Sequence, residues 1–334
     1  MLIRERLEEQ ELEYLSPRAS FSRYSRGRRD PEEECDIRTA FQRDRDRILH
    51  SKAFRRLKDK TQVFLSPQGD HYRTRLTHTL EVSQNARTIA KALKLNEELV
   101  EAIALGHDLG HTPFGHAGER ALNAVCPLGF RHNEQSVRTV ELLEKRGKGL
   151  NLTWETKDGI LNHQMSSTPS TLEGKVVRLS DKIAYIHHDM DDALRAGILT
   201  EQDIPEELSK KLGCTCNERL GTFVHDIITT SIAAGDIAMS EEIYSAMQSF
   251  RAFMFDNVYT NPVAKGEEGR AEGLVKALYE HFCAHTEELP EDFLLLLERG
   301  EEKERVICDY VAAMSDRFAI HTYTELNIPK SWVI

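Results

Sequence analysis

Apolar residues recur every three to four positions along most of the chain, which is the spacing of helices that bury one face. The periodicity is clear over 76–93 and again over 174–197, a segment that runs from one glycine to another. The segment 96–110 is apolar nearly all round in its middle and starts with Asn96, a favourable N-cap residue, so it predicts a buried central helix. Because alternating β-branched runs are nearly absent, we predict an all-α fold.

The C-terminal third repeats the amphipathic pattern, and its last segment is expected to form a helix that packs back on the preceding domain. The segments with this pattern are 219–235, 241–255, 272–285 and 303–320. For Asp316 and Arg317 we expect no more than a local ion pair. The chain then divides into a basic N-terminal arm (1–39), a helical core (40–200) and a helical C-terminal region (201–334) that packs on the core and supplies oligomer contacts.

The composition is that of an ordinary soluble globular protein, since 40% of the 334 residues are hydrophobic and 30% are charged. No apolar run approaches the roughly 20 residues that a membrane helix needs. The N-terminus is charged from its fourth residue and lacks the apolar core of a signal peptide. We therefore expect a cytoplasmic protein with no membrane partner. The six cysteines contain no CxxC pair and are expected to be reduced thiols.

Charge is distributed unevenly along the chain. The net charge is −11, yet the segment 14–29 contains five arginines and no acidic residue. Such a cluster could bind a polyanion, and its interleaved aromatic residues suit single-stranded nucleic acid. It could equally dock on an acidic face of a neighbouring subunit, or form a solvated, partly disordered arm. The sequence alone leaves these three interpretations open.

The stretch 104–122, "ALGHDLGHTPFGHAGERAL", holds the most informative chemistry. Its adjacent pair His107 and Asp108 comes at the end of the predicted buried helix, just before Gly110. An ionised aspartate in such a place is costly unless it has a charged partner. A divalent metal is a suitable partner, because imidazole and carboxylate together are good ligands for such ions.

Two further ligands are expected from other helices. His78 lies on the apolar stripe of the segment 76–93, and Asp181 lies on an apolar stripe of the segment 174–197. Each residue alone has an ordinary structural explanation, because a single histidine on an apolar face is usually a hydrogen-bonded core residue. The combination of His78, Asp181 and the pair His107-Asp108 on three buried helices favours a metal centre.

The order of these residues resembles the H…HD…D signature of the HD-domain superfamily of metal-dependent phosphohydrolases. The similarity is closer to the bacterial dGTPase-like deoxynucleoside triphosphate triphosphohydrolases. It extends over about residues 15–200 and returns over 309–320. The blocks that carry it include "RTRLTHTLEVSQNARTIAKAL" (73–93), "ALGHDLGHTPFGHAGERAL" (104–122), "FRHNEQSVR" (130–138) and "VVRLSDKIAYIHHDMDDAL" (176–194).

The resemblance implies an HD-domain helical bundle over 40–200 that hydrolyses a dNTP to the deoxynucleoside and inorganic triphosphate. It also implies one divalent metal per active site, such as Mg²⁺, Mn²⁺ or another transition metal. His116 and Glu119 are three positions apart and therefore share a helix face. The resemblance gives this pair, together with His132, the catalytic role.

The resemblance also assigns residues to the substrate. Arg75, one turn before His78, and Lys182 would contact phosphates. Tyr185 and Asp189 lie one turn apart on the helix face of Asp181 and would form the sugar pocket, where a tyrosine near C2′ excludes a 2′-hydroxyl. The residue Gln62 matches a glutamine near the base and sugar.

Several possibilities remain open from the sequence. His132 and His163 could hold a second metal, although the closer resemblance favours one, and His111, His187 and His188 are expected to be structural or to orient ligands. Relatives form homo-oligomers, hexamers or tetramers, and some are activated by a nucleotide at a subunit interface. The chain could instead be another HD phosphohydrolase, acting on nucleoside monophosphates, cyclic dinucleotides or nucleic-acid ends. It could also be a non-catalytic module that binds nucleotides or single-stranded nucleic acid.

Overall fold

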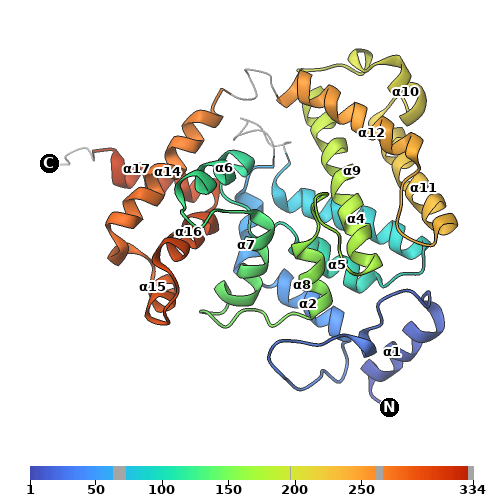
Figure 1. Ribbon diagram of the computed structural model, residues 1–334, viewed down its shortest axis with the longest axis horizontal. Coiled ribbons are helices and arrows are strands. Elements are labelled where there is room, and N and C mark those ends of the chain that lie inside the picture. The colour runs from blue at the N-terminus through green and yellow to red at the C-terminus, as the bar shows by residue number, and fades with distance from the viewer. Residues whose placement is uncertain (63–72, 196, 260–265, 330–334) are drawn as a thin grey trace.

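The structure is a computed structural model that describes residues 1–62, 73–195, 197–259 and 266–329. All regular elements in these ranges are helices (Figure 1), which confirms the all-α prediction. Two isolated β-bridges, Arg28 with Thr153 and Thr61 with Thr74, are the exceptions within the described part. In the same residues, no helix is both long and apolar enough to cross a membrane.

A central helix, α5, is surrounded by four others that form the core. These helices are α2 (Ala40–Leu49), α4 (Arg75–Ala92), α5 (Glu97–Gly106), α8 (Trp154–Leu161) and α9 (Leu172–Arg195). Asn96 caps α5 as predicted, because its side chain accepts hydrogen bonds from the backbone N–H groups of Glu98 and Leu99 at 3.1 and 3.3 Å. Most of α5 is buried, but the helix ends at Gly106 rather than at Gly110.

Three further helices lie between the core helices along the chain. They are α3 (Lys52–Arg56), α6 (Gly115–Val125) and α7 (His132–Arg138). The backbone at Gly110 passes so close to α7 that a Cβ there would lie 2.2 Å from the backbone nitrogen of Ser136. Glycine is therefore required at this position for the turn after α5 to reach α7.

Residues after 201 pack against the core in two separate places (Figure 1). The helices α10 (Glu206–Leu212), α11 (Cys216–Ala234) and α12 (Glu241–Met254) share one hydrophobic cluster with α4, α5 and α9. The helices α14 (Glu268–Ala284), α15 (Glu291–Glu298), α16 (Lys303–Ala313) and α17 (Asp316–Asn327) share another cluster with α6. The C-terminal residues therefore approach the core from two sides.

We expected the segment 303–320 to form one helix, but the structure divides it between two helices. It breaks at Met314, and Ser315 caps α17 by accepting from the backbone N–H of Phe318 at 3.4 Å. The expectation for Asp316 was also wrong. Its carboxylate is buried and accepts hydrogen bonds from the backbone N–H groups of Thr61 and Phe114, each at 3.0 Å.

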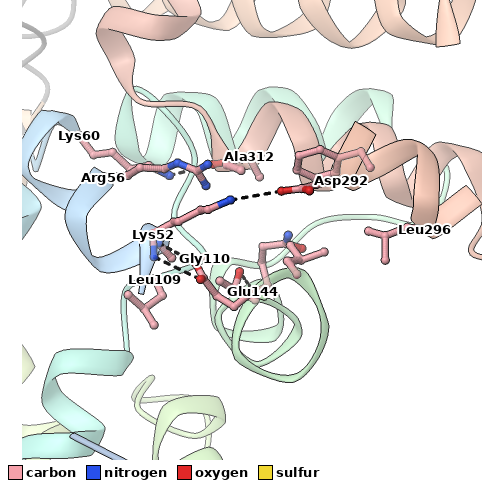
Figure 2. A pocket seen from close by; sticks show the side chains of 15 residues that line it. Lys52, Arg56, Lys60, Leu109, Gly110, Glu144, Asp292, Leu296 and Ala312 are labelled. Carbon is pink, nitrogen blue, oxygen red and sulfur yellow. Dashed lines mark hydrogen bonds and ion pairs between the residues drawn. The ribbon is translucent and has the colours of Figure 1, made fainter. Parts of the chain in front are cut away.

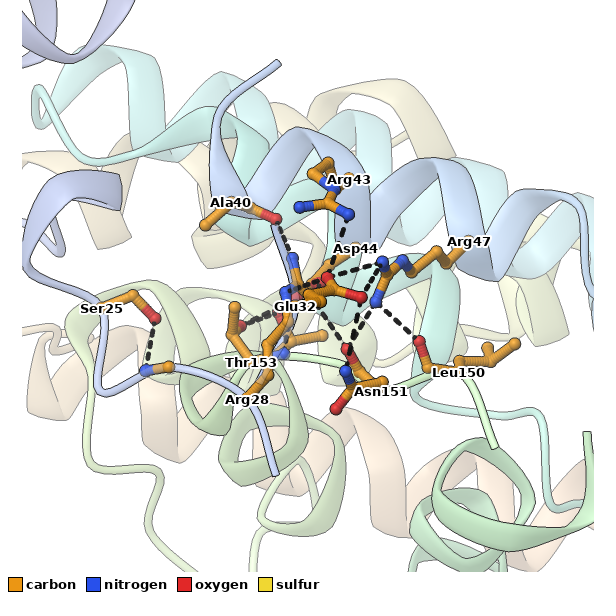
Figure 3. Close-up of polar contacts among 12 residues, drawn as sticks. Ser25, Arg28, Glu32, Ala40, Arg43, Asp44, Arg47, Leu150, Asn151 and Thr153 are labelled. Carbon is orange, nitrogen blue, oxygen red and sulfur yellow. Dashed lines mark hydrogen bonds and ion pairs between the residues drawn. The ribbon is translucent and has the colours of Figure 1, made fainter. Parts of the chain in front are cut away.

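The N-terminal residues contain a helix, α1 (Ile3–Tyr14), and the arginine cluster that follows it packs on the core. Arg28 donates to the buried carboxylate of Asp44 and to the backbone oxygens of Asn151 and Ala40 at 2.6 and 2.9 Å (Figure 3). Asp44 also accepts from the backbone N–H of Thr153 at 2.9 Å. At least this arginine therefore serves the fold and is not free to bind a polyanion.

Candidate metal centre and active site

Four side chains from three helical segments meet at the C-terminal end of α5. His107 and Asp108 directly follow that helix, while His78 is on α4 and Asp181 on α9. The Nε2 atom of His78 lies 3.1 Å from Oδ1 of Asp181, and Nε2 of His107 lies 3.7 Å from the same oxygen. One ligand atom each of His78, His107 and Asp108 lies within 4.8 Å of the others. The structure thus brings the predicted set together.

The chemistry of these atoms fits a divalent cation. The Nδ1 atom of His107 is 2.7 Å from the backbone oxygen of Ala104, so it carries the proton and leaves the Nε2 lone pair free. Within the described residues this buried Nε2 atom has no hydrogen-bond partner. A buried acceptor of this kind, facing two carboxylates, is costly unless a cation occupies the space between them.

Electrostatics keep both carboxylates charged. Burial alone would raise the pKa of Asp108, but the neighbouring His107, His111 and Arg75 hold that pKa well below its usual range. In the same way, the contact with His78 and the nearby His107 lower the pKa of Asp181 despite its burial. Both groups are therefore anionic at neutral pH, as metal ligands must be.

The predicted catalytic residues meet around one carboxylate. Glu119 lies 3.3 Å from Nδ1 of His116 and 2.9 Å from Nδ1 of His132. It also accepts from the backbone N–H of His132 at 2.9 Å. Because Glu119 binds the Nδ1 side of both rings, it fixes their orientation and leaves their Nε2 atoms for other partners.

The geometry of α6 depends on the residue before it. Phe114 adopts a left-handed backbone conformation with a φ of 62°, which is unfavourable for a residue other than glycine. The hydrogen bond from its N–H to Asp316 holds this conformation. The first helical residues, Gly115 and His116, are thereby placed at the edge of the site by a residue from the far end of the chain.

The site opens into a cavity of about 560 Å³. The predicted substrate residues Gln62, Arg75, Lys182 and Tyr185 line it. So do three of the predicted metal ligands and two of the predicted catalytic residues: His78, Asp108, Asp181, His116 and His132. Asp189 is not among the described residues that line the cavity.

Asp189 is buried next to Tyr185. It is fully buried, and burial raises its pKa well above the usual range. The pKa of Tyr185 is likewise raised, chiefly by burial and further by the nearby Asp189, with which it forms a hydrogen bond. An effect of Asp189 on a substrate would therefore pass through Tyr185.

Arg75 has a partner that the sequence did not predict. One of its terminal nitrogens lies 2.7 Å from Oδ2 of Asp108, and both side chains are buried. The guanidinium therefore holds a predicted metal ligand while it also lines the cavity. A contact with phosphate would come from its remaining N–H groups.

Sequence reasoning missed part of the cavity wall. Arg251 on α12 and Phe255, the residue after that helix, line the cavity. Both come more than sixty residues after Asp181, the last predicted metal ligand in the sequence. Gln164 and Met165 in the loop after α8 also line it. The only local signal was a charged residue within the apolar run "SFRAFMF", and an amphipathic surface helix has the same pattern.

A second group of possible ligands adjoins the first. Asp108, His111 and His132 each offer an atom within 4.8 Å of the others, and all three are buried. The Nε2 atoms of His132 and His163 lie 3.3 Å apart. The possibility of a second metal, which the sequence left open, thus remains a hypothesis.

The turn that carries the predicted ligands His107 and Asp108 packs against the C-terminal helices. A small cavity of about 50 Å³ is lined by Leu109 and Gly110, which directly follow the HD pair, and by residues of α15 and α16 (Figure 2). Lys60 also lines it and donates from Nζ to the backbone oxygens of His111 and Ala312, the latter at 2.8 Å. Burial lowers the pKa of Lys60 to about 7. This lysine ties the active-site turn to α16.

The fold and the site define an HD-domain protein, and comparison with known proteins agrees. The HD domain model matches residues 75–186, and a model described as the phosphohydrolase-associated domain matches residues 237–325. The two matches together include all four predicted metal ligands and also Arg251.

Curated relatives match along almost their whole length. A deoxyguanosinetriphosphate triphosphohydrolase-like protein of Caldanaerobacter subterraneus subsp. tengcongensis is 57% identical, covering 99% of this chain and 98% of the relative. Proteins with the same description from Clostridium perfringens and Desulfatibacillum aliphaticivorans are 49% and 45% identical, and the matches cover at least 99% of both partners. The chain belongs to the family of deoxyguanosinetriphosphate triphosphohydrolase-like proteins.

Proposed function

We propose that this chain is a metal-dependent hydrolase that cleaves a deoxynucleoside triphosphate into the deoxynucleoside and inorganic triphosphate. The observation that carries the proposal is the convergence of His78, His107, Asp108 and Asp181 beside a cavity of about 560 Å³. The cavity is large enough for a nucleotide and is also lined by cationic side chains. The names of the chain's relatives point to the same class of substrate.

The metal would be held by those four side chains. A divalent cation bound there supplies Lewis-acid polarisation of the α-phosphate. The carboxylates of Asp108 and Asp181 are anionic and can bind the cation, and the free Nε2 atom of His107 completes a mixed nitrogen and oxygen set. Mg²⁺ and Mn²⁺ are the first ions to test.

Proton transfer would be carried out by Glu119 and the two histidines that it contacts, His116 and His132. Water adds to the α-phosphorus, the bond from that phosphorus to the 5′-oxygen breaks, and the departing 5′-oxygen takes up one proton as the attacking water loses one, which gives the 5′-hydroxyl of the deoxynucleoside. His116 lines the cavity, and Glu119 holds its Nδ1 side, so its Nε2 atom is the one that can exchange a proton there. His132, held by the same carboxylate, would donate a hydrogen bond to the phosphate.

The triphosphate would be bound by cations on three elements. Arg75 on α4, Lys182 on α9 and Arg251 on α12 line one cavity. Burial lowers the pKa of Lys182, and the charge of Arg251 lowers it further, so the two cations repel each other. A bound polyphosphate would relieve that repulsion, which gives the site a preference for highly charged substrates.

The sugar and base would lie against Tyr185 and Gln62. The Tyr185 ring lines the cavity one turn from Asp181 and is backed by the buried Asp189. A ring fixed in this way would leave no room for a 2′-hydroxyl, which favours deoxyribose. The amide of Gln62 has an oxygen with no partner among the described residues and could bind the substrate.

The test is an assay of all four dNTPs, singly and mixed, with Mg²⁺ and with Mn²⁺. Product identified as triphosphate by ion-exchange chromatography supports the proposal, whereas pyrophosphate or orthophosphate contradicts it. His107→Ala should abolish the activity. Nucleoside monophosphates and cyclic dinucleotides, assayed in parallel, test for another phosphohydrolase, and binding without turnover over hours would indicate a non-catalytic module.

Assembly, regulation and location are also part of the proposal. The family resemblance implies a homo-oligomer, either a hexamer or a tetramer, with a nucleotide activator, and the composition predicts a cytoplasmic protein. Light scattering coupled to size-exclusion chromatography, with and without each nucleotide, measures the oligomeric state and its response to a nucleotide. Competition with single-stranded DNA in the same assay tests nucleic acid as a partner.

A further inference from the structure

The proposed ligand His78 has a polar partner on its other ring nitrogen. Its Nδ1 atom lies 3.2 Å from Nδ1 of His188 on α9. The Nε2 atom of His188 in turn lies against the carboxylate of Glu81, which is one turn after His78 on α4. His78 and His188 are both buried, so neither ring can turn to water for these hydrogen bonds.

The direction of the hydrogen bonds follows from the chemistry of the rings. A histidine that binds a metal through Nε2, the atom facing Asp181, must carry its proton on Nδ1. That proton needs an acceptor, and Nδ1 of His188 can accept only if His188 carries its own proton on Nε2. The carboxylate of Glu81 accepts that second proton, so one arrangement satisfies all three groups.

We propose that Glu81 and His188 form a relay that fixes the tautomer and the ring orientation of His78, and so raises the affinity of the centre for its metal. Both are positioning residues, since they act through His78. The inference rests on the metal centre of the proposed function, and it is independent of which substrate the centre acts on.

The relay is itself anchored. Arg73 lies 3.2 Å from a carboxylate oxygen of Glu81 and reaches Asp191 and Asp192 on α9 at 2.7 and 2.9 Å. These contacts hold Glu81 between the two helices that carry His78 and Asp181. The Nδ1 atom of the other proposed histidine ligand, His107, contacts a backbone carbonyl, whereas Nδ1 of His78 contacts the side chain of His188. A side-chain substitution can therefore remove only the partner of His78.

The experiment measures metal binding without turnover. Full-length protein stripped with a chelator is titrated with Mn²⁺ or Co²⁺ in competition with a chromophoric chelator. Glu81→Ala and His188→Ala should each weaken binding by about 10- to 100-fold, the usual effect of losing such a partner of a metal-bound histidine. Glu81→Gln, which keeps an acceptor oxygen, should restore most of the affinity lost in Glu81→Ala.

Two features separate a relay from a general loss of structure. Because the residues act in series, Glu81→Ala combined with His188→Ala should bind metal no more weakly than His188→Ala alone. The control His50→Ala, at an exposed histidine directly after α2, should bind metal as the wild type does. Melting temperatures of the metal-free variants close to that of the wild type confirm that the fold is intact.

Wild-type affinity in both single variants would overturn the inference, as would effects that multiply in the double variant. Failure of the proposed function gives a different pattern. If the wild-type protein binds metal but releases no triphosphate, the relay is still tested by affinity alone. If His107→Ala binds metal as tightly as the wild type, the metal centre itself is wrong, and the relay falls with it.

Discussion

The carboxylate of Glu119 accepts two hydrogen bonds from His132, one from the backbone N–H and one from Nδ1, each at 2.9 Å. A side chain held by two hydrogen bonds to one partner has little freedom, and its second oxygen still reaches Nδ1 of His116 at 3.3 Å. The carboxylate therefore links two histidines of the cavity wall, and the buried one, His132, lies close to the predicted metal ligand Asp108.

Removing this coupling should affect the chemical step. We expect Glu119→Gln to lower kcat by about 100-fold or more, because general acid–base groups contribute about 10²–10⁴-fold, with little change in KM. Steady-state kinetics at saturating metal measure the two constants. Glu134→Gln, an exposed residue on α7, is the control and should behave as the wild type does. A rise in KM at constant kcat would mean that Glu119 binds substrate instead.

Arg251 tests the contribution of the C-terminal region to the site. Its side chain lines the cavity, and among the described residues it has no carboxylate partner. We expect Arg251→Gln to raise KM for a dNTP by roughly 10- to 100-fold, the effect of one hydrogen bond to a charged group. The control Arg270→Gln removes an exposed arginine on α14 that pairs with Glu267. Equal KM values for the two variants would exclude Arg251 from phosphate binding.

Tyr185 tests the preference for deoxyribose. If its ring fills the space near C2′, Tyr185→Ala should raise activity on ribonucleotides relative to deoxyribonucleotides by about 10- to 100-fold, since a single steric contact discriminates to that extent. The measurement is kcat/KM for a matched pair such as dGTP and GTP. Tyr244→Ala, on the exposed part of α12, should leave the ratio unchanged. An unchanged ratio in Tyr185→Ala would place the ribose elsewhere.

The convergence of the predicted metal ligands could be anticipated from the sequence because its signals are local. His107 and Asp108 directly follow a helix whose apolar residues mark it as buried, and His78 lies on an apolar stripe where a polar side chain needs a partner. Such patterns depend on one helix at a time. That these side chains converge was an inference, which the structure bears out in position, while their role as ligands stays a prediction.

The rest of the site depends on packing between distant segments, and no local pattern encodes that. Arg251 faces the cavity because α12 packs against α9, and Asp316 reaches Phe114 because α17 packs on α14, which in turn packs on α6. The sequence around each residue is compatible with a surface helix. The misplaced end of α5 and the missed break at Ser315 have a similar origin, since tertiary contacts decide where a helix stops.

Loss of the buried ion pair between Arg28 and Asp44, neither of which lines the cavity, should have a large effect on stability. Asp44 is fully buried, so Arg28→Met would leave its charge without a counter-ion and should cost about 3–5 kcal/mol in the free energy of unfolding. Urea denaturation measures this change. The control Asp30→Asn breaks the neighbouring exposed pair with Arg29 and should have little effect. Metal affinity should be unchanged in both variants, and a loss of less than 1 kcal/mol in Arg28→Met would contradict the prediction.

Stability should also depend on pH through Glu119. Burial would raise its pKa, but hydrogen bonds from His116 and His132 lower it below the ordinary value of 4.5. A carboxyl group whose pKa is depressed by folding stabilises the protein fully above about 4.5, and this contribution is lost as the pH falls towards the folded-state value. The difference in the free energy of unfolding between wild type and Glu119→Gln should therefore be larger at pH 7 than at pH 3. Urea denaturation of chelator-treated protein at both pH values measures it, and a difference independent of pH would show that the charge of Glu119 is not stabilised by its two histidines.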